Sequence, residues 1–429
     1  MQKFLELKKI PLLFFLLLSA FGPIIFQKLN LRLDQFFIYS SFIFLVIKSP
    51  KSTFAFNRNL LLFTTPFVFM AIYSTVMSTI NLDQTSIKNI LSGLENFIQP
   101  AVLFLILNFL YLQQNKSEII KNLHLIFDTL VLLLCLNSLF MILSVYYDYS
   151  NIYNLFKPSQ AFVKDTTHLV RQSGIFDQPV ESGLIYSIAL ILWLYLFALK
   201  YKIKTSVSIF EMTKLFLIVS GGLISISKTF LFVGSPLFFL MCLFFYKSKG
   251  KILQFAAIFS FSIFFLLSLA PWPGSSMFLG YFTPKNYTIE SSLSIVSGSR
   301  YNLSASSGNG FAFQSGILDN SIDIYQKHFF GKGITKYMAL DNGLLEFFSY
   351  AGFFGILSFF YLIFLIFYTT RRLHHIDKKM AIYIFAISVL IVVANLGSPV
   401  FTMNRVSIPI WITFFTISTY LDKLDSEIK

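Results

Sequence analysis

Long apolar runs separated by short polar stretches make up most of this sequence. A helix needs about 20 consecutive apolar residues to cross the hydrocarbon core of a bilayer. Windows of about that length lie near residues 10–28, 31–48, 60–80, 91–112, 123–146, 183–201, 210–227, 229–247, 252–270, 343–368, 379–396 and 404–421. The pattern predicts an all-α polytopic membrane protein with about 12 transmembrane helices. Arg32 and Asp34 weaken the second window, and Lys228 marks a break between the seventh and eighth.

The composition supports a membrane protein and excludes several soluble classes. Hydrophobic residues make up 55% of the 429 positions, and only 13% are charged, which is too apolar for a surface in water. The net charge of +14 comes from basic residues scattered singly between apolar runs, so nucleic acid is not an expected partner. Cys135 and Cys242 lie inside apolar runs, where we expect them to be small hydrophobic packers.

The distribution of positive charge predicts the orientation in the membrane. With the N-terminus in the cytoplasm and alternating helices, more than half of the 34 lysines and arginines fall in short cytoplasmic connections, as the positive-inside rule requires. Both termini are then cytoplasmic, and two long segments lie outside. The predicted organisation is N-terminal helices 1–146, a first outer segment 147–182, central helices 183–270, a large outer loop 271–342 and C-terminal helices 343–429.

The cytoplasmic side offers no apparatus for a nucleotide. No connection there is long enough to fold as a domain, and neither a P-loop nor a dinucleotide glycine motif occurs. The outer segments contain no Asp-x-Asp pair. We therefore expect chemistry on the outer face that uses no ATP, no cofactor and no metal.

Several cations from separate segments fall on the predicted outer face. Lys228 is the most informative, because it divides two apolar runs, and an ionisable residue enclosed in apolar sequence is a functional candidate. Snorkelling to lipid headgroups is the competing interpretation. Converging lysines and arginines favour an anionic group such as a lipid pyrophosphate. The candidate pyrophosphate-binding residues are Arg171, Lys228, Arg300, Lys332 and Arg405.

The order of these motifs resembles the O-antigen ligase and polymerase superfamily, and within it the Wzy-type polysaccharide polymerases. The resemblance covers about residues 165–360 and joins motifs that are each weak alone. An Asp341-Asn342 pair stands where ligases usually have His before Asn, which favours a polymerase. The matching positions are Arg171, Gly174, Phe176 and Pro179, then Ser227-Lys228, Ser299-Arg300, Gly331 and Gly333, Asp341-Asn342, Glu346, Gly352 and Gly355.

The resemblance implies a GT-C-like membrane glycosyltransferase in the bacterial inner membrane, with its active face in the periplasm. Its substrate would be an oligosaccharide repeat unit carried on undecaprenyl pyrophosphate, and membrane lipids and a chain-length regulator would be its partners. Arg171 and Arg300 are then catalytic candidates that stabilise developing negative charge, and Asp341 is the candidate base. Secondary candidates are Glu181, Asp177, Asn342 and Glu346. Simple helix capping by Asp341 is the alternative to catalysis.

Two other functions stay open. An O-antigen ligase would pass finished polymer to lipid A-core. A lipid-linked sugar flippase or secondary transporter would use charges buried within spans. Most cations of this chain flank the predicted spans, whereas Glu95 and Lys214 lie within them. Structural pairing or placement at the membrane interface explains both at least as well.

Overall fold

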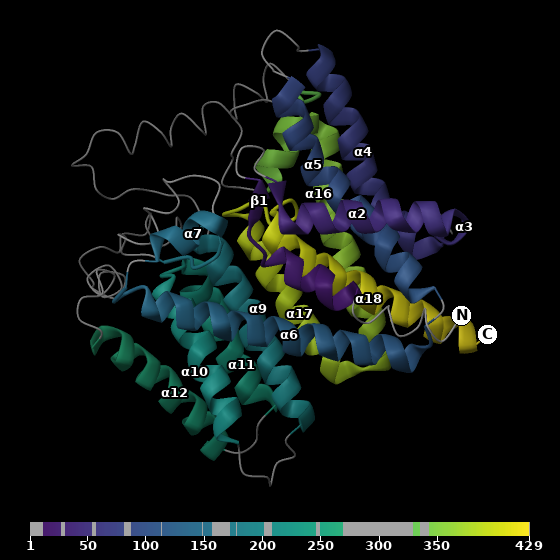
Figure 1. The fold of residues 1–429 in the computed structure, drawn as a ribbon. Coiled ribbons are helices and arrows are strands. Elements are labelled where there is room, and N and C mark those ends of the chain that lie inside the picture. Colours follow the sequence, from purple (N-terminus) through teal and green to yellow (C-terminus); the bar gives the residue numbers. More distant parts are fainter. Residues whose placement is uncertain are drawn as a thin grey trace. The chain divides into compact units, whose positions relative to one another are not determined.

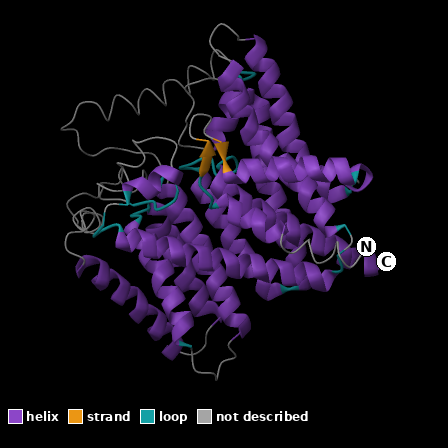
Figure 2. Ribbon diagram, in the orientation of Figure 1, coloured by secondary structure: helices purple, strands orange, loops and turns teal. Residues whose placement is uncertain are grey.

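The structure, a computed structural model, is almost entirely helical (Figure 1). Its two short strands, β1 (Ile24–Phe26) and β2 (Leu31–Arg32), form one antiparallel pair, drawn in orange in Figure 2. The described residues are 12–26, 31–53, 57–80, 87–112, 114–147, 149–156, 172–176, 178–200, 208–245, 249–268, 329–334 and 343–428.

Among the described residues, seven helices are long and apolar enough to cross a membrane. Many of their apolar side chains are exposed, such as Ile72 and Phe264, as expected where the solvent is lipid. The prediction of an all-α, multi-pass membrane protein is confirmed at this level. These helices are α4 (Arg58–Ile80), α5 (Ile87–Tyr111), α6 (Lys116–Leu143), α9 (Pro179–Lys200), α12 (Lys249–Ser268), α16 (Gly343–Ile376) and α17 (Lys378–Asn395).

The first predicted window differs from the structure. Helix covers only residues 12–20, and the chain then turns through Gly22 and Pro23 into β1. Proline lacks a backbone N–H and disfavours the helical conformation of the residue before it. The prediction of a helix up to residue 28 was therefore wrong.

The other predicted windows correspond to shorter or more polar helices. Helices α2 (Leu33–Lys48) and α10 (Ile209–Ile224) have 16 residues each, or about 24 Å at 1.5 Å per residue. A π-helix, η3 (Thr229–Gly234), runs directly into α11 (Ser235–Phe245). The last window lies in α18 (Asn404–Ile428), and the short helix α3 (Pro50–Thr53) completes the N-terminal half.

The chain divides into two compact units, and each is described separately. The first contains the described residues of Met1–Phe36, Ile120–Pro284 and His374–Ile391. Helix α9 is its most enclosed span, with 83% of its apolar window buried. Trp193 of α9 stacks on Phe197 with ring centroids 5.0 Å apart, and Phe255 of α12 packs edge-on at 5.6 Å. Aromatic packing thus holds α9 against α12.

The second unit contains the described residues of Phe37–Ile119, Lys285–Leu373 and Val392–Lys429. Its core is also aromatic, because Phe63, Phe67 and Phe104 surround Trp411 of α18 at 5.3–6.4 Å between centroids. A hydrogen bond of 2.8 Å joins the hydroxyls of Tyr111 and Thr416. Inside an apolar core this bond stabilises the fold, since each hydroxyl would otherwise be desolvated without a hydrogen-bond partner.

Candidate functional site

The structure describes half of the predicted site residues. Glu181 and Lys228 belong to the first unit, and Lys332, Glu346 and Arg405 to the second. The other candidates, Arg171, Asp177, Arg300, Asp341 and Asn342, lie outside the described residues.

The segment that follows Arg171 forms a buried turn in the first unit. Gly174 has φ +59°, and a Cβ there would overlap the Asn137 side chain of α6. The next N–H, of Ile175, donates to Asn137 Oδ1 at 3.1 Å. Only glycine combines this left-handed conformation with so close an approach. Phe176 is fully buried beyond the turn, so the Gly-x-Phe pattern is explained by local packing.

Asn137 belongs to a buried hydrogen-bonded cluster with Ser138 and Tyr186, which was not predicted from the sequence. Its Nδ2 donates to the Tyr186 hydroxyl of α9 at 3.0 Å, and the Ser138 hydroxyl bonds the same oxygen at 2.9 Å. Gly221 of α10 packs against both Ser138 and Tyr186 without room for a Cβ. The available signal was the presence of polar residues inside the windows 123–146 and 183–201. Paired polar groups at such positions tie α6, α9 and α10 together.

The same buried turn also bonds the end of α10. The Gln172 N–H donates to Ile224 O at 3.3 Å, and Gln172 Oε1 accepts from Ser144 Oγ at 2.7 Å. Burial raises the pKa of the Tyr153 phenol in α7 (Ser150–Phe156) to about 12. The turn therefore has satisfied partners on two sides.

Lys228 lies at a break in the helix, as the sequence predicted. Helix α10 ends at Ile224, and η3 begins at Thr229. Between them Ile226 adopts φ +44°, which is unusual for a β-branched residue. Ser227 is buried against Gly183 of α9, where a Cβ would overlap it. The Lys228 side chain itself is half-buried.

The beginning of α9 completes this part of the first unit. Pro179 is the first helical residue, a position where its missing N–H is not needed. Ser182 Oγ donates to Ser173 O at 2.9 Å, which fixes the buried turn to the helix start. Glu181 lies beside Ser182 in the first turn and is buried. The fold thus brings residues 172–176, 181–183 and 224–228 together in one unit.

In the second unit, α16 is interrupted at Gly352, whose φ is +58°. The segment 329–334 bonds the interrupted turn: Lys332 N–H donates to Ser349 O at 2.8 Å, and Gly333 N–H donates to Tyr350 O at 3.1 Å. In return, Phe353 N–H donates to Phe329 O at 3.1 Å. Irregular backbone is tolerated in a membrane protein where such partners replace the lost helix bonds.

Glu346 lies in the first turn of α16, one turn before Ser349, and is buried. Its Oε2 accepts from the Thr402 hydroxyl at 2.8 Å, and the Tyr350 side chain also hydrogen-bonds the carboxylate. Arg405, three residues after Thr402, is buried at the start of α18. Glu346 therefore joins the beginning of α16 to the turn before α18.

Comparisons with known proteins add no family. No protein-family model matches this chain, and no curated protein matches it significantly. Within the described part of the chain, no group of three or more His, Cys, Asp or Glu side chains could hold a metal ion.

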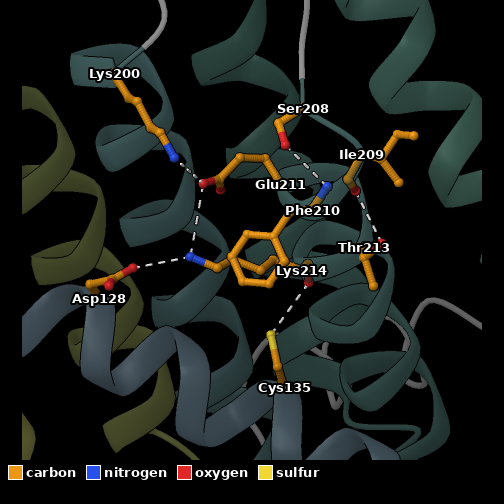
Figure 3. A network of polar contacts seen from close by, with 9 residues as sticks. All are labelled: Asp128, Cys135, Lys200, Ser208, Ile209, Phe210, Glu211, Thr213 and Lys214. Atoms are coloured by element: carbon orange, nitrogen blue, oxygen red, sulfur yellow. Dashed lines mark hydrogen bonds and ion pairs between the residues drawn. The ribbon is translucent and has the colours of Figure 1, made fainter.

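Lys214, one of the two charges that favoured a transporter, is paired. Figure 3 shows its ammonium between two carboxylates, Asp128 at 3.1 Å and Glu211 at 3.9 Å. Lys200 at the end of α9 bonds Glu211 at 2.9 Å, and the Phe210 ring lies 4.8 Å from Lys214 Nζ. This network joins α6, α9 and α10, and its two positive and two negative charges cancel. Structural pairing explains Lys214 without a transport pathway.

Proposed function

We propose that this protein polymerises oligosaccharide repeat units carried on undecaprenyl pyrophosphate into O-antigen or capsular polysaccharide. The reaction takes place at the periplasmic face of the bacterial inner membrane and needs no metal. The single observation that carries the proposal is the bond between two separate motifs: the turn after Arg171 donates from Gln172 N–H to Ile224 O, four residues before Lys228. Motifs that lie about 50 residues apart in the sequence thus belong to one local structure, as a shared site requires.

The proposed reaction moves the growing chain onto a new lipid-linked unit. A hydroxyl at the non-reducing end of the new unit attacks the anomeric carbon of the chain. The new glycosidic bond forms as the bond to undecaprenyl pyrophosphate breaks, and the electron pair leaves with the pyrophosphate. The hydroxyl proton goes to a carboxylate, for which Asp341 is the first candidate and Glu181 or Asp177 the next.

Catalysis in this proposal depends on charge stabilisation and alignment. Because the leaving pyrophosphate gathers negative charge, fixed cations lower the barrier most when they are oriented before the reaction. Arg171, Lys228 and Arg300 supply this charge. Lys332 and Arg405 are further pyrophosphate-binding candidates. Supporting evidence is that the described members are held in place: Lys332 by its backbone bond to Ser349 O and Arg405 by burial.

The secondary candidates have different supports. Glu346 accepts hydrogen bonds from Thr402 and Tyr350, which favours a role in holding the start of α16. Asn342 directly precedes that helix in sequence and is a further secondary candidate.

The proposal includes a topology. The apolar windows and the positive-inside pattern support twelve spans and cytoplasmic termini, and the resemblance to the polymerase family implies a GT-C-like arrangement. The polymer's length distribution would then be set with a chain-length regulator protein.

The decisive experiment replaces the two predicted catalytic arginines. Arg171→Ala and Arg300→Ala are expected to leave the protein in the membrane and to stop surface polymer from lengthening. Losing a cation that acts mainly in the transition state costs about 100-fold or more in rate. Arg371→Ala is the matched control, because Arg371 is an exposed arginine at the far end of α16, and its polymer ladder should be normal. Normal ladders from both test variants would refute the proposal.

The same variants distinguish the alternatives. A defective polymerase still caps the lipid A-core with one repeat unit, whereas a defective ligase leaves the core bare. Purified protein that lengthens lipid-linked units already exposed on the outer leaflet of vesicles acts without transport, which excludes the flippase.

A further inference from the structure

The turn between α10 and η3 contains the most strained backbone in the described chain. Ile226 is the one non-glycine residue there with a positive φ, +44°. Left-handed backbone is costly for any side chain, and most of all for a β-branched one. Ile226 is nevertheless fully buried. Strain of this kind persists only where the surrounding structure enforces it, and it collects at functional sites.

The surroundings of the turn do enforce it. Ile226 N–H donates to Leu223 O at 2.9 Å, and Leu231 N–H donates to Ser227 O at 3.0 Å. Two glycines let neighbouring side chains approach closely: Gly183 lies against Ser227, and Gly222 against Phe230. A side chain at either glycine would overlap its neighbour. The backbone on both sides of Lys228 is therefore fixed.

The helix that follows Lys228 is also irregular. Residues Thr229–Gly234 form a π-helix before α11 begins, and Gly234 packs against Ser187 of α9. A π-turn accommodates one extra residue and so rotates the side chains before it relative to those after it. Without the turn and the π-helix, Lys228 would lie one α-helical turn beyond Ile224 and on the same face. The two irregularities together decide where its ammonium is presented.

We propose that the left-handed turn at Ile226, held by the contact between Gly183 and Ser227, is a positioning device that fixes the orientation of Lys228 toward its anionic ligand. Ile226 and Gly183 are then positioning residues for the transferase reaction. The functional part of this inference rests on the proposed function, in which Lys228 binds the lipid pyrophosphate. The geometric part concerns the Lys228 side chain alone.

The test compares Ile226→Gly with Ile226→Ala. Both remove the buried side chain, but only glycine adopts the left-handed conformation without cost. Ile226→Gly should therefore unfold at a higher temperature than Ile226→Ala in detergent. Because alanine is strained in the left-handed conformation, the turn should give way in Ile226→Ala, so Lys228 should lose its fixed orientation there and keep it in Ile226→Gly.

Acylation of Lys228 by an amine-reactive ester, followed by mass spectrometry, reads its orientation without reference to activity. We expect Lys228 to react at least threefold faster in Ile226→Ala than in Ile226→Gly, while the exposed Lys121 of α6 reacts equally in both. With purified protein and lipid-linked repeat units, kcat/KM should be at least tenfold lower in Ile226→Ala than in Ile226→Gly, measured at a temperature where both variants are folded. In a Lys228→Ala background this difference in activity should vanish.

A second pair of variants leaves Ile226 in place. Gly183→Ala drives a methyl group into Ser227. Gly183→Ala with Ser227→Gly removes the overlapping atoms, since Phe230 Cβ would lie at an ordinary contact distance of 3.6 Å from the new methyl group. Acylation of Lys228 should change at least threefold in the single variant and return toward the wild-type rate in the double variant.

Equal acylation rates within both pairs would overturn the positioning device. A lower stability of Ile226→Gly than of Ile226→Ala would overturn it as well, because the turn would then carry no left-handed strain. If the acylation rates differ but Lys228→Ala lengthens polymer normally, the orientation of Lys228 is established and the proposed function of Lys228 fails.

Discussion

Replacing Lys214 by methionine tests whether the charges in the network of Figure 3 are structural or part of a transport route. The side chains of Lys214 and Glu211 are only 10% and 9% exposed, whereas Asp128 is 49% and Lys200 is 59% exposed. Removing Lys214 leaves the buried Glu211 carboxylate with Lys200 alone. Removing Glu211 leaves Lys214 with its closer partner Asp128, at 3.1 Å.

These exposures set the expected free energies of unfolding. Lys214→Met should cost about 3 kcal/mol, the lower end of the range for breaking a buried ion pair, because Lys200 still bonds Glu211. Glu211→Met should cost about 1 kcal/mol, as for a part-exposed pair. Adding Glu211→Met to Lys214→Met should recover about 2 kcal/mol, since apolar side chains replace a buried pair with little loss. The remaining Asp128 and Lys200 are exposed enough to be solvated.

Thermal unfolding in detergent, followed by intrinsic fluorescence, measures these differences. At about 1–2 °C per kcal/mol for a chain of this size, Lys214→Met should lower Tm by about 3–6 °C, and the double variant should regain more than half of that. Lys121→Met is the control, because Lys121 is an exposed lysine on α6, the helix that carries Asp128, and it should change stability by less than about 0.5 kcal/mol.

The transport hypothesis makes the opposite prediction. A charge that moves substrate or protons is needed for activity and is not restored by removing its partner. If Lys214→Met abolishes activity at unchanged Tm, and Glu211→Met does not restore it, then the network is functional and the reasoning from burial and pairing is wrong.

Two further predictions concern the turns of the candidate site. Gly174→Ala should destabilise the protein by about 2–4 kcal/mol, from left-handed strain and overlap with Asn137. Gly250→Ala, in an exposed helical position, is the control and should be neutral or slightly stabilising. Equal Tm values for the two variants would contradict the close approach of Gly174 to Asn137. Thr402→Val should cost about 1–3 kcal/mol, because the buried Glu346 loses a hydroxyl donor, and Glu346→Gln should cost less because its amide oxygen still accepts from Thr402. Thermal unfolding measures both, and a Tm for Thr402→Val equal to wild type would contradict the structural role of Glu346.

Several features of the fold could be predicted from the sequence because they depend on local chemistry. Apolar windows of sufficient length predicted every one of the seven long helices, since a spanning segment must satisfy its own backbone. Lys228 between two apolar runs predicted the break after α10. Helix ends were predicted less accurately. The first window was extended past Gly22-Pro23 because the sequence stays apolar there, although the backbone leaves the helical conformation.

The sequence predicted candidate site residues but not the buried polar residues that hold the neighbouring turn in place. Asn137 and Tyr186 were counted only as parts of apolar windows. Asn137 nevertheless holds the turn after Arg171 by accepting from Ile175 N–H, and the Tyr186 hydroxyl bonds both Asn137 and Ser138. Their role depends on which helices are neighbours, and hydrophobic periodicity carries no information about that.

By itself the sequence determined the lipid solvent, the helical class and the break in the helix at Lys228. Each of these follows from transfer free energies and charge along a single stretch of chain. The tertiary structure alone decided that the turn 172–176 bonds the end of α10, that the segment 329–334 bonds the backbone of α16 where Gly352 interrupts it, and that Lys214 is neutralised by its neighbours. These are contacts between residues distant in sequence, and only the packing of helices against one another creates them.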